Sequence, residues 1–288
     1  MVNLLHICEI MTGRWVDESE IRVPIEVFKR FAERNHFTIE KKSKGDTCKY
    51  KLSRIKIPVF FISGSDQKEF KFMDIADVHI GNAHFDEKAL RNKLRYAVYS
   101  GVKQVFIAGD LFEGICNDNC EKVFSSQIEQ AFNIFKDYPL HYYAINGNHD
   151  YSFEQRSFPN PIKTLSIRLK EIGIDFEYFD TYLMDFIICG VIKRVMHVER
   201  QDFSKKSIFA TLKLKQFDED GMLLNTYEGK TYPVRFFQVG HIHVNVQMYY
   251  SKRKVFISQS GSFIETDRCL DCANVISGNV IDQKVLMD

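Results

Sequence analysis

The stretch of sequence that decides the fold is Phe72-Met73-Asp74-Ile75-Ala76-Asp77-Val78-His79-Ile80-Gly81. It predicts a buried strand that ends in Asp77 and His79. Because side chains alternate along a strand, these two project to the same side. An acid and an imidazole supply an oxygen and a nitrogen donor, which is half of a metal site. Asp-x-His alone is common in proteins, so a metal site needs further ligands from later parts of the chain.

Three later stretches have the same character. Each is an apolar run that stops at a glycine-flanked group of metal-binding side chains: Ile107-Ala108-Gly109-Asp110, Ala144-Ile145-Asn146-Gly147-Asn148-His149-Asp150 and Val239-Gly240-His241-Ile242-His243. Glycines at these strand ends fit a close approach of two backbones or a positive φ. Together the four strand ends predict one metal centre.

The order of the motifs, Asp-x-His, Gly-Asp, Gly-Asn-His-Asp and Gly-His-x-His, resembles the calcineurin-like metallophosphoesterase superfamily. The resemblance runs from Phe72 to about Phe263. Asp77–Gly81 and Gly109–Phe112 are also similar to the D-x-H-L-G and G-D-L-F motifs of one branch, the nuclease subunits of DNA double-strand-break repair. The resemblance implies a two-sheet β-sandwich flanked by helices, with metal ions at one edge. It also implies a metal-dependent hydrolase of phosphodiesters, with DNA as the expected substrate.

The resemblance assigns a role to each motif residue. The first metal ion would be held by Asp77, His79 and His243, the second by Asn148 and His241, and Asp110 would bridge the two. His149 would contact the phosphate and protonate the leaving group, and Asp150 would orient its ring. His84, on the loop after the first motif, is a candidate substrate contact, with a plain surface histidine as the alternative. Donors without a thiolate suit manganese, iron or zinc, and the family often uses manganese.

One feature departs from the family pattern. The family supplies another histidine to the second metal from a strand between the Gly-Asn-His-Asp and Gly-His-x-His motifs. We expect the matching strand at residues 207–214, which hold no histidine. Lys213 lies near the expected position, and a protonated ammonium cannot ligate. Either His197, which precedes that strand, takes the role, or the second site is depleted and binds its metal weakly.

The pattern along the chain after Phe70 alternates strand and helix. Expected elements are helices over 86–100, 121–138 and 161–172 and strands over 104–108 and 141–145. This order predicts a partly parallel sheet, with its ligands at the carboxyl ends of the strands. Expected strands at 186–191, 207–214, 234–239, 244–250, 255–258 and 274–287 predict a second sheet. The fold class is therefore α/β.

Residues 1–68 are expected to form a small α+β extension, and residues 69–288 the metallophosphoesterase domain. The extension has an expected helix at 21–37 and strands at 38–40, 49–52 and 58–62. Its lysines and arginines are interleaved with aromatic residues. This pattern indicates either a solvated charged face or a nucleic-acid contact surface.

Composition limits the remaining choices. A formal net charge of +1 gives no overall attraction to nucleic acid. The sequence contains no apolar run long enough to cross a bilayer and no leader-like start, which predicts a cytoplasmic protein without membrane contact. Seven cysteines do not suggest a disulfide framework. Two close pairs, Cys116 with Cys120 and Cys269 with Cys272, either bind a structural zinc ion or are reduced thiols.

Other functions compete with the DNA nuclease. A phosphatase or a cyclic-nucleotide phosphodiesterase would use the same metal centre on a small substrate. A scaffold that has lost catalysis would bind a protein partner, and a homodimer is one expectation for the assembly. The chain ends soon after its last expected strand, so we expect no carboxy-terminal capping domain of the kind that repair nucleases carry.

Overall fold

The computed structural model describes residues 14–21, 24–25, 28, 37–44, 47–54, 57–62, 69–115, 120–198, 209–219, 221–264 and 273–279. The chain forms two compact units, Met1–Ile57 and Pro58–Asp288. The sequence placed the boundary at residue 68, but strand β4 (Val59–Phe61) pairs with β9 (Leu183–Ile188) inside the second unit. Within the described residues, no helix is long and apolar enough to cross a membrane.

The first unit contains a three-stranded antiparallel sheet in the order β1-β3-β2. Its strands are β1 (Trp15–Asp17), β2 (Phe37–Lys44) and β3 (Thr47–Arg54). Val16 and Tyr50 are buried on one face of this sheet. The helix expected over 21–37 falls largely outside the described residues.

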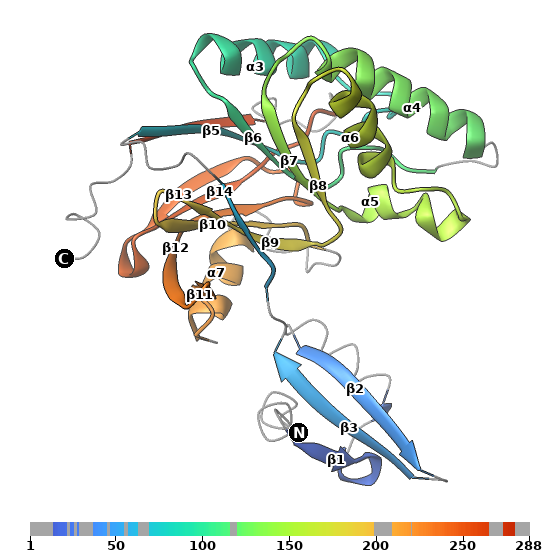
Figure 1. The fold of residues 1–288 in the computed structure, drawn as a ribbon, viewed down its shortest axis with the longest axis vertical. Coiled ribbons are helices and arrows are strands. Elements are labelled where there is room, and N and C mark those ends of the chain that lie inside the picture. The colour runs from blue at the N-terminus through green and yellow to red at the C-terminus, as the bar shows by residue number, and fades with distance from the viewer. Residues whose placement is uncertain are drawn as a thin grey trace. The chain divides into compact units, whose positions relative to one another are not determined.

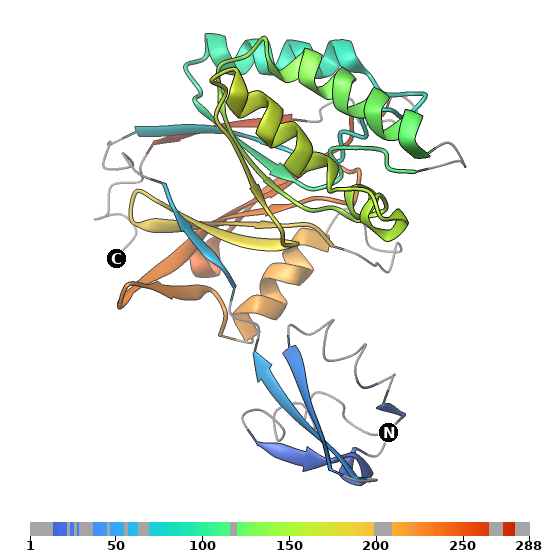
Figure 2. The same cartoon turned by 45° about the vertical axis from the view of Figure 1, so that its right-hand side comes forward.

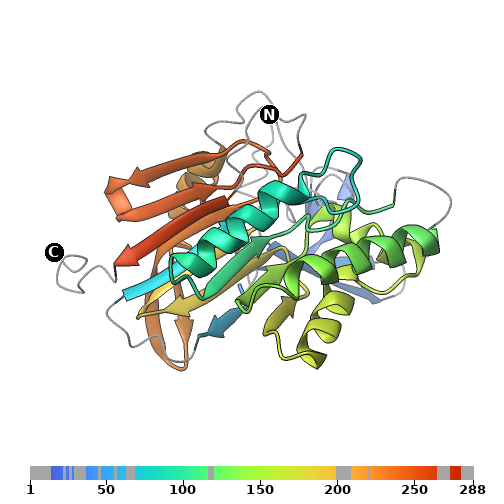
Figure 3. The same ribbon diagram turned by 90° about the horizontal axis from the view of Figure 1, so that it is seen from above.

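A five-stranded sheet begins the second unit, in the order β15-β5-β6-β7-β8. Its strands are β5 (Glu69–Ile75), β6 (Gln104–Ala108), β7 (His141–Ile145), β8 (Phe176–Phe179) and β15 (Ala273–Asn279). Strands β5 to β8 run parallel, and β15 pairs antiparallel with β5. Helices α3 (Glu87–Tyr99), α4 (Cys120–Phe135) and α6 (Pro161–Glu171) cover its outer face (Figures 1 and 3). The predicted alternation of strand and helix is confirmed.

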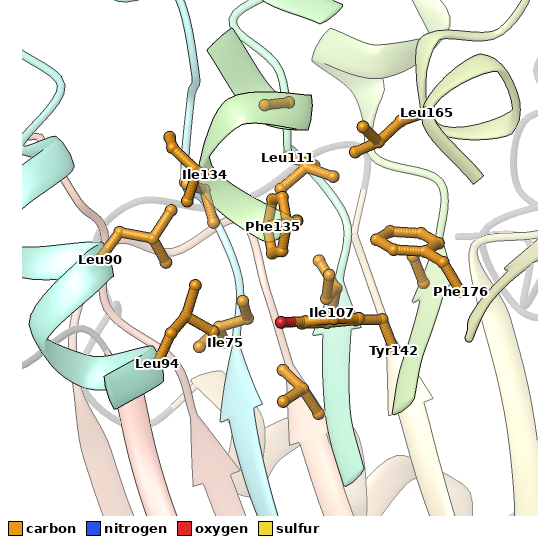
Figure 4. Packing of buried hydrophobic residues seen from close by; sticks show 14 of the residues in the cluster. Ile75, Leu90, Leu94, Ile107, Leu111, Ile134, Phe135, Tyr142, Leu165 and Phe176 are labelled. Carbon is orange, nitrogen blue, oxygen red and sulfur yellow. The ribbon is translucent and has the colours of Figure 1, made fainter. Parts of the chain in front are cut away.

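Burial of apolar side chains fixes the helices on this face. Each of the four parallel strands contributes a buried side chain to one layer, and each of the three helices packs onto it (Figure 4). The layer includes Ile75, Ile107, Tyr142 and Phe176 from the strands and Leu90, Leu94, Phe135 and Leu165 from the helices. Each fully buried side chain of this size stabilises the folded state by about 1.5–3 kcal/mol.

The second sheet has the order β13-β14-β12-β10-β9-β4, with β11 paired to β12. Its further strands are β10 (Val191–Met196), β11 (Leu224–Tyr227), β12 (Lys230–Val239), β13 (Val246–Tyr250) and β14 (Val255–Gln259). Strands β9 and β10 form a hairpin whose two turn residues, Cys189 and Gly190, both have positive φ, as a type I′ turn requires. The two sheets stack face to face with helices outside (Figure 2), so the predicted sandwich is confirmed.

The strand expected over 207–214 is wrong. Its described part belongs to helix α7 (Phe209–Glu219), which packs on the outer face of the second sheet. The buried residues Ala210, Leu214 and Phe217 recur at helical spacing. Lys213, expected near the metal site, instead donates to Gln216 at 3.3 Å on the same helix.

Buried polar contacts also cross the interface between the two sheets. Nζ of Lys193 on β10 lies 2.7 Å from Oδ1 of Asp74 on β5, and both side chains are almost fully buried. The side-chain amide of Gln238 on β12 donates to the carbonyl oxygens of Ile75, at 3.0 Å, and Phe106, at 3.2 Å. These contacts fix the two sheets where their strands approach the candidate site.

Candidate metal centre

The candidate ligands come after the carboxyl ends of five strands. Asp77 and His79 come after β5, Asp110 after β6, and Asn148 after β7. His197 comes after β10, and His241 and His243 after β12. Because β5, β6 and β7 are parallel in one sheet and β10 and β12 are parallel in the other, their ends meet at one edge of the sandwich. The strand expected to include Asp77 and His79 stops at Ile75, so both lie on the loop after it.

The first group comprises Asp77, His79 and His243, whose ligand atoms lie within 4.8 Å of one another. The Nε2 atoms of His79 and His243 face each other at 3.1 Å. Both oxygens of Asp77 accept the backbone N–H of His241, at 2.7 and 2.8 Å. One carboxylate and two facing imidazole nitrogens suit a first-row divalent cation.

The second group comprises Asp110, His197 and His241. Nε2 of His197 lies 3.3 Å from Oδ2 of Asp110 and 3.1 Å from Oδ1 of Asn148. Nδ1 of His241 lies 3.9 Å from the same Asp110 oxygen. Nδ1 of His197 is 2.8 Å from the carbonyl oxygen of Ala108 and donates to it, so Nε2 faces the site. The sequence left two alternatives, a depleted second site or a site completed by His197. The structure favours the second, because it brings His197 into this group.

Unpartnered polar atoms indicate that a cation fits here. Oδ2 of Asp110 and Nδ1 of His241 are buried, and neither has a hydrogen-bond partner among the described residues. Oδ1 of Asp110 accepts the backbone N–H of His149 at 2.8 Å. A buried carboxylate oxygen without a partner is costly, and a divalent cation between these atoms would satisfy both.

The pKa values show that the buried groups of this site depend on one another for their charge. Burial raises the pKa of Asp77 well above its usual range, and the nearby Asp110 carboxylate adds to this. Burial opposes the charged form of Asp110, but the charge of the nearby His197 outweighs it and lowers the pKa of Asp110 well below its usual range. Burial disfavours the charged form of His197, but the Asp110 carboxylate raises its pKa to about 9. A bound cation would replace the proton on His197 as the counter-charge.

Backbone strain concentrates at the same place. Nine non-glycine residues in the described part of the chain have positive φ, and five belong to the two groups: Asp77, His79, Asp110, His241 and His243. This conformation is uncommon outside glycine and is typical of functional sites. At Gly147 any side chain would meet the backbone nitrogen and carboxylate of Asp110, and at Gly240 the carbonyl of Ala108. The predicted close approach is confirmed at both glycines.

His149 lies beside the first group. Its ring centroid is 4.7 Å from that of His79. Its Nδ1 lies 2.8 Å from the carbonyl oxygen of Glu113 and donates to it, which turns Nε2 away from the backbone. The carboxylate of the same Glu113 accepts from Nδ1 of His79 at 2.9 Å. Glu113 therefore contacts both imidazoles, a role that no motif in the sequence indicated.

The role expected for Asp150 is wrong, because its carboxylate does not orient His149. Its Oδ1 accepts the backbone N–H of Phe112 and its Oδ2 that of Gly147, each at 2.9 Å. These bonds join the loop after β6 to the first turn of α5 (Asn148–Tyr151). Asp150 thus holds the two loop segments that carry Asp110 and Asn148, through the backbone N–H groups of Phe112 and Gly147. Burial and the Asp110 charge raise its pKa to about 7.

Two other predicted sites have different outcomes. His84 is exposed and belongs to none of the metal-ligand groups found among the described residues. Its contact with substrate stays a prediction. The proposed zinc site lies outside the described residues, because Cys116, Cys269, Cys272 and the side chain of Cys120 all do.

Comparison with known families decides the wider assignment. The model of the calcineurin-like phosphoesterase family matches residues 70–245, more than half of the chain. The chain belongs to the calcineurin-like phosphoesterase family. This membership makes it a metallophosphoesterase-type hydrolase and its Asp and His groups the candidate metal ligands.

Other comparisons are more distant. A similar solved structure is a dimetal phosphatase from Danio rerio, which is 14% identical, with a TM-score of 0.40. The alignment covers 68% of this calcineurin-like chain and 88% of the other. No curated protein sequence matches.

Proposed function

We propose that the chain is a phosphodiesterase that uses two divalent cations, with manganese as the leading metal and nucleic acid as the leading substrate. The observation that carries this proposal is the position of Asp110. Its Oδ2 faces His197 and His241, while its backbone carbonyl accepts from the N–H of His79 in the first group. Asp110 thus belongs to the second group through its carboxylate and contacts the first through its backbone, so its carboxylate is the ligand that two cations would share.

The residues divide into two sets in this proposal. Asp77, His79 and His243 would hold one cation, and Asn148, His197 and His241 the other, with Asp110 between them. Bound there, the cations would lower the pKa of a water molecule and neutralise charge on the phosphoryl oxygens. The protein's own contribution is to fix these donors before the substrate arrives.

His149 would supply the proton. Its Nδ1 donates to the carbonyl oxygen of Glu113, so Nε2 is the atom that would transfer a proton to the leaving oxygen. Its ring is held beside His79 at the edge of the metal groups. This arrangement is suited to general-acid catalysis, in which the proton donor and its orienting partner are already in contact.

The nuclease assignment rests on the motifs Asp77–Gly81 and Gly109–Phe112 and on the basic first unit. A phosphomonoesterase would use the same donors, so substrate class must be measured. Purified protein with manganese would be assayed against bis(p-nitrophenyl) phosphate, p-nitrophenyl phosphate and single-stranded DNA. We expect turnover of the diester and of DNA above that of the monoester.

The control for this assay is a pair of matched variants. Asp110→Asn should nearly abolish hydrolysis, because an amide gives only part of the charge compensation that a shared carboxylate gives. Asp137→Asn makes the same chemical change in an exposed ion pair with Arg91 and should leave turnover unchanged. Wild-type turnover in a folded Asp110→Asn protein would refute the proposed site, and preference for the monoester would refute the proposed substrate class.

A further inference from the structure

The outer face of the N-terminal sheet gathers an aromatic ring and several lysines. Strand register places Trp15 opposite Lys51, and Lys49 opposite both Asp17 and Lys42. Because side chains alternate across a strand, these residues share one face, and the buried Val16 and Tyr50 share the other. The sheet therefore has an apolar inner face and a basic outer face.

Trp15 is the centre of this outer face. Nζ of Lys42 lies 4.3 Å from the centroid of the Trp15 ring, and Nζ of Lys51 lies 6.0 Å from it. The ring is partly exposed, and Lys42 is exposed. An aromatic ring with ammonium groups over it combines the stacking surface and the positive charge with which proteins bind the bases and phosphates of single strands.

The acids on this face do not cancel its charge. Asp17 pairs with Lys49 at 3.3 Å and Glu40 pairs with Lys51 at 3.5 Å, and both acids are exposed. Exposed pairs of this kind are weak and screened by salt, so a phosphate can replace either carboxylate. Lys42 has the Trp15 ring as its contact and adds a further positive charge.

The charge of the whole chain is divided between the two units. Residues 1–57 contain 12 lysines and arginines against 8 acids, a formal net charge of +4. The remaining residues therefore carry −3, since the whole chain carries +1. The small net charge of the whole chain therefore does not reflect the first unit, whose positive charge favours binding to polyanions.

We propose that this face binds single-stranded nucleic acid, with a base stacked on Trp15 and phosphates at Lys42, Lys49 and Lys51. An acidic peptide would use the lysines but would not need the ring, whereas every base has a π-face. This proposal makes the proposed function more specific, because it names the nucleic acid as single-stranded. It rests on the proposed function only for the hydrolysis of the bound strand. Binding itself needs no metal.

The test uses the full chain in EDTA, so that no hydrolysis occurs. Trp15 is the only tryptophan in the sequence, so tryptophan fluorescence, excited at a wavelength that tyrosine does not absorb, reports this face alone. We expect saturable quenching by an oligothymidylate of about 12 nucleotides, with an affinity that falls as salt rises. Poly-glutamate of similar charge should leave the fluorescence nearly unchanged, and quenching equal to that by oligothymidylate would overturn the assignment to nucleic acid.

Variants then separate the ring from the charge. In anisotropy titrations with a labelled oligothymidylate, Trp15→Ala should weaken binding by about tenfold or more. Trp15→Phe, which retains an aromatic ring, should weaken it less and guards against misfolding. Lys42→Gln should weaken binding and reduce its salt dependence by about one phosphate contact.

The matched control is Lys230→Gln, because Nζ of Lys230 lies 5.1 Å from the Tyr232 ring on β12 of the second unit. Equal affinities of Lys42→Gln, Lys230→Gln and wild type would overturn the inference. Hydrolysis of bis(p-nitrophenyl) phosphate, measured on the same proteins, separates the two proposals. Turnover without oligonucleotide binding refutes only this inference, and binding without turnover refutes only the proposed function.

Discussion

Nδ1 of His79 donates to the carboxylate of Glu113 at 2.9 Å, which leaves Nε2 of His79 facing His243. The pKa of Glu113 is lowered, because hydrogen bonds from His79 and Asn82 outweigh partial burial. An ionised carboxylate only accepts, so it fixes the imidazole tautomer. Such partners orient metal-binding histidines and raise their basicity.

Glu113→Gln should therefore weaken metal binding at the first group by about 10–100-fold. The amide keeps the size of the side chain but accepts less strongly and can turn its donor toward His79. Calorimetric titration with manganese would measure the change. Glu121→Gln, in the first turn of α4, is the matched control. Equal affinities in both variants would show that Glu113 does not act through His79.

His149→Ala should keep metal binding and lower turnover by about 10²–10⁴-fold, the usual contribution of a general acid. The loss should shrink for esters with good leaving groups, because these need less protonation. Rates for a series of aryl phosphodiesters would test this. Should the loss be the same for good and poor leaving groups, His149 is not the proton donor.

Metal affinity should rise with pH. The Asp110 carboxylate, opposed by burial, raises the pKa of His197 to about 9 in the metal-free protein. Below that pH the ring holds a proton that a cation must displace, so binding releases a proton and tightens toward pH 9; above it this dependence ends. Manganese titrations in two buffers of different ionisation enthalpy count the proton. His197→Gln should release fewer protons, and equal release would contradict this assignment.

The buried pair between the sheets should show its cost when one partner is removed. Burial lowers the pKa of Lys193 and raises that of Asp74, although each partner opposes the shift. Lys193→Met leaves an unpaired buried acid and should cost about 3–5 kcal/mol of unfolding free energy, while adding Asp74→Leu should recover most of it. Lys170→Met, in an exposed pair with Glu177, should cost at most about 1 kcal/mol. If urea unfolding gave similar losses of unfolding free energy for Lys193→Met and Lys170→Met, then buried Asp74 would not depend on its ion pair with Lys193.

Those buried charges also explain what the sequence did not predict. Apolar runs ending at glycine located the ligands after β5, β6, β7 and β12. Strand β10 was not recognised, because it carries Lys193 and Arg194, which are typical of exposed segments. Both are buried, and Arg194 makes a bidentate pair with Asp185 at 2.7 and 2.8 Å. Because that strand was not predicted, the sequence did not show that His197 follows a strand end beside the other ligands.

The false strand has a matching cause. Alternating apolar and polar residues from 210 to 214 fit a strand period, yet the same residues also bury Ala210 and Leu214 on one helix face. Asp150 shows a different limit. Its place next to His149 suggested a contact between side chains, whereas the short helix α5 directs its carboxylate to backbone N–H groups. Sequence spacing does not reveal such bonds.

The most direct test of the central claim is the number of manganese ions that the wild-type chain binds, measured by calorimetric titration of metal-free protein. We predict two ions per chain, with Asp110→Asn weakening both, because the proposed site has the two ions share the Asp110 carboxylate. A single bound ion in the wild-type protein, or two ions unaffected by Asp110→Asn, would contradict it.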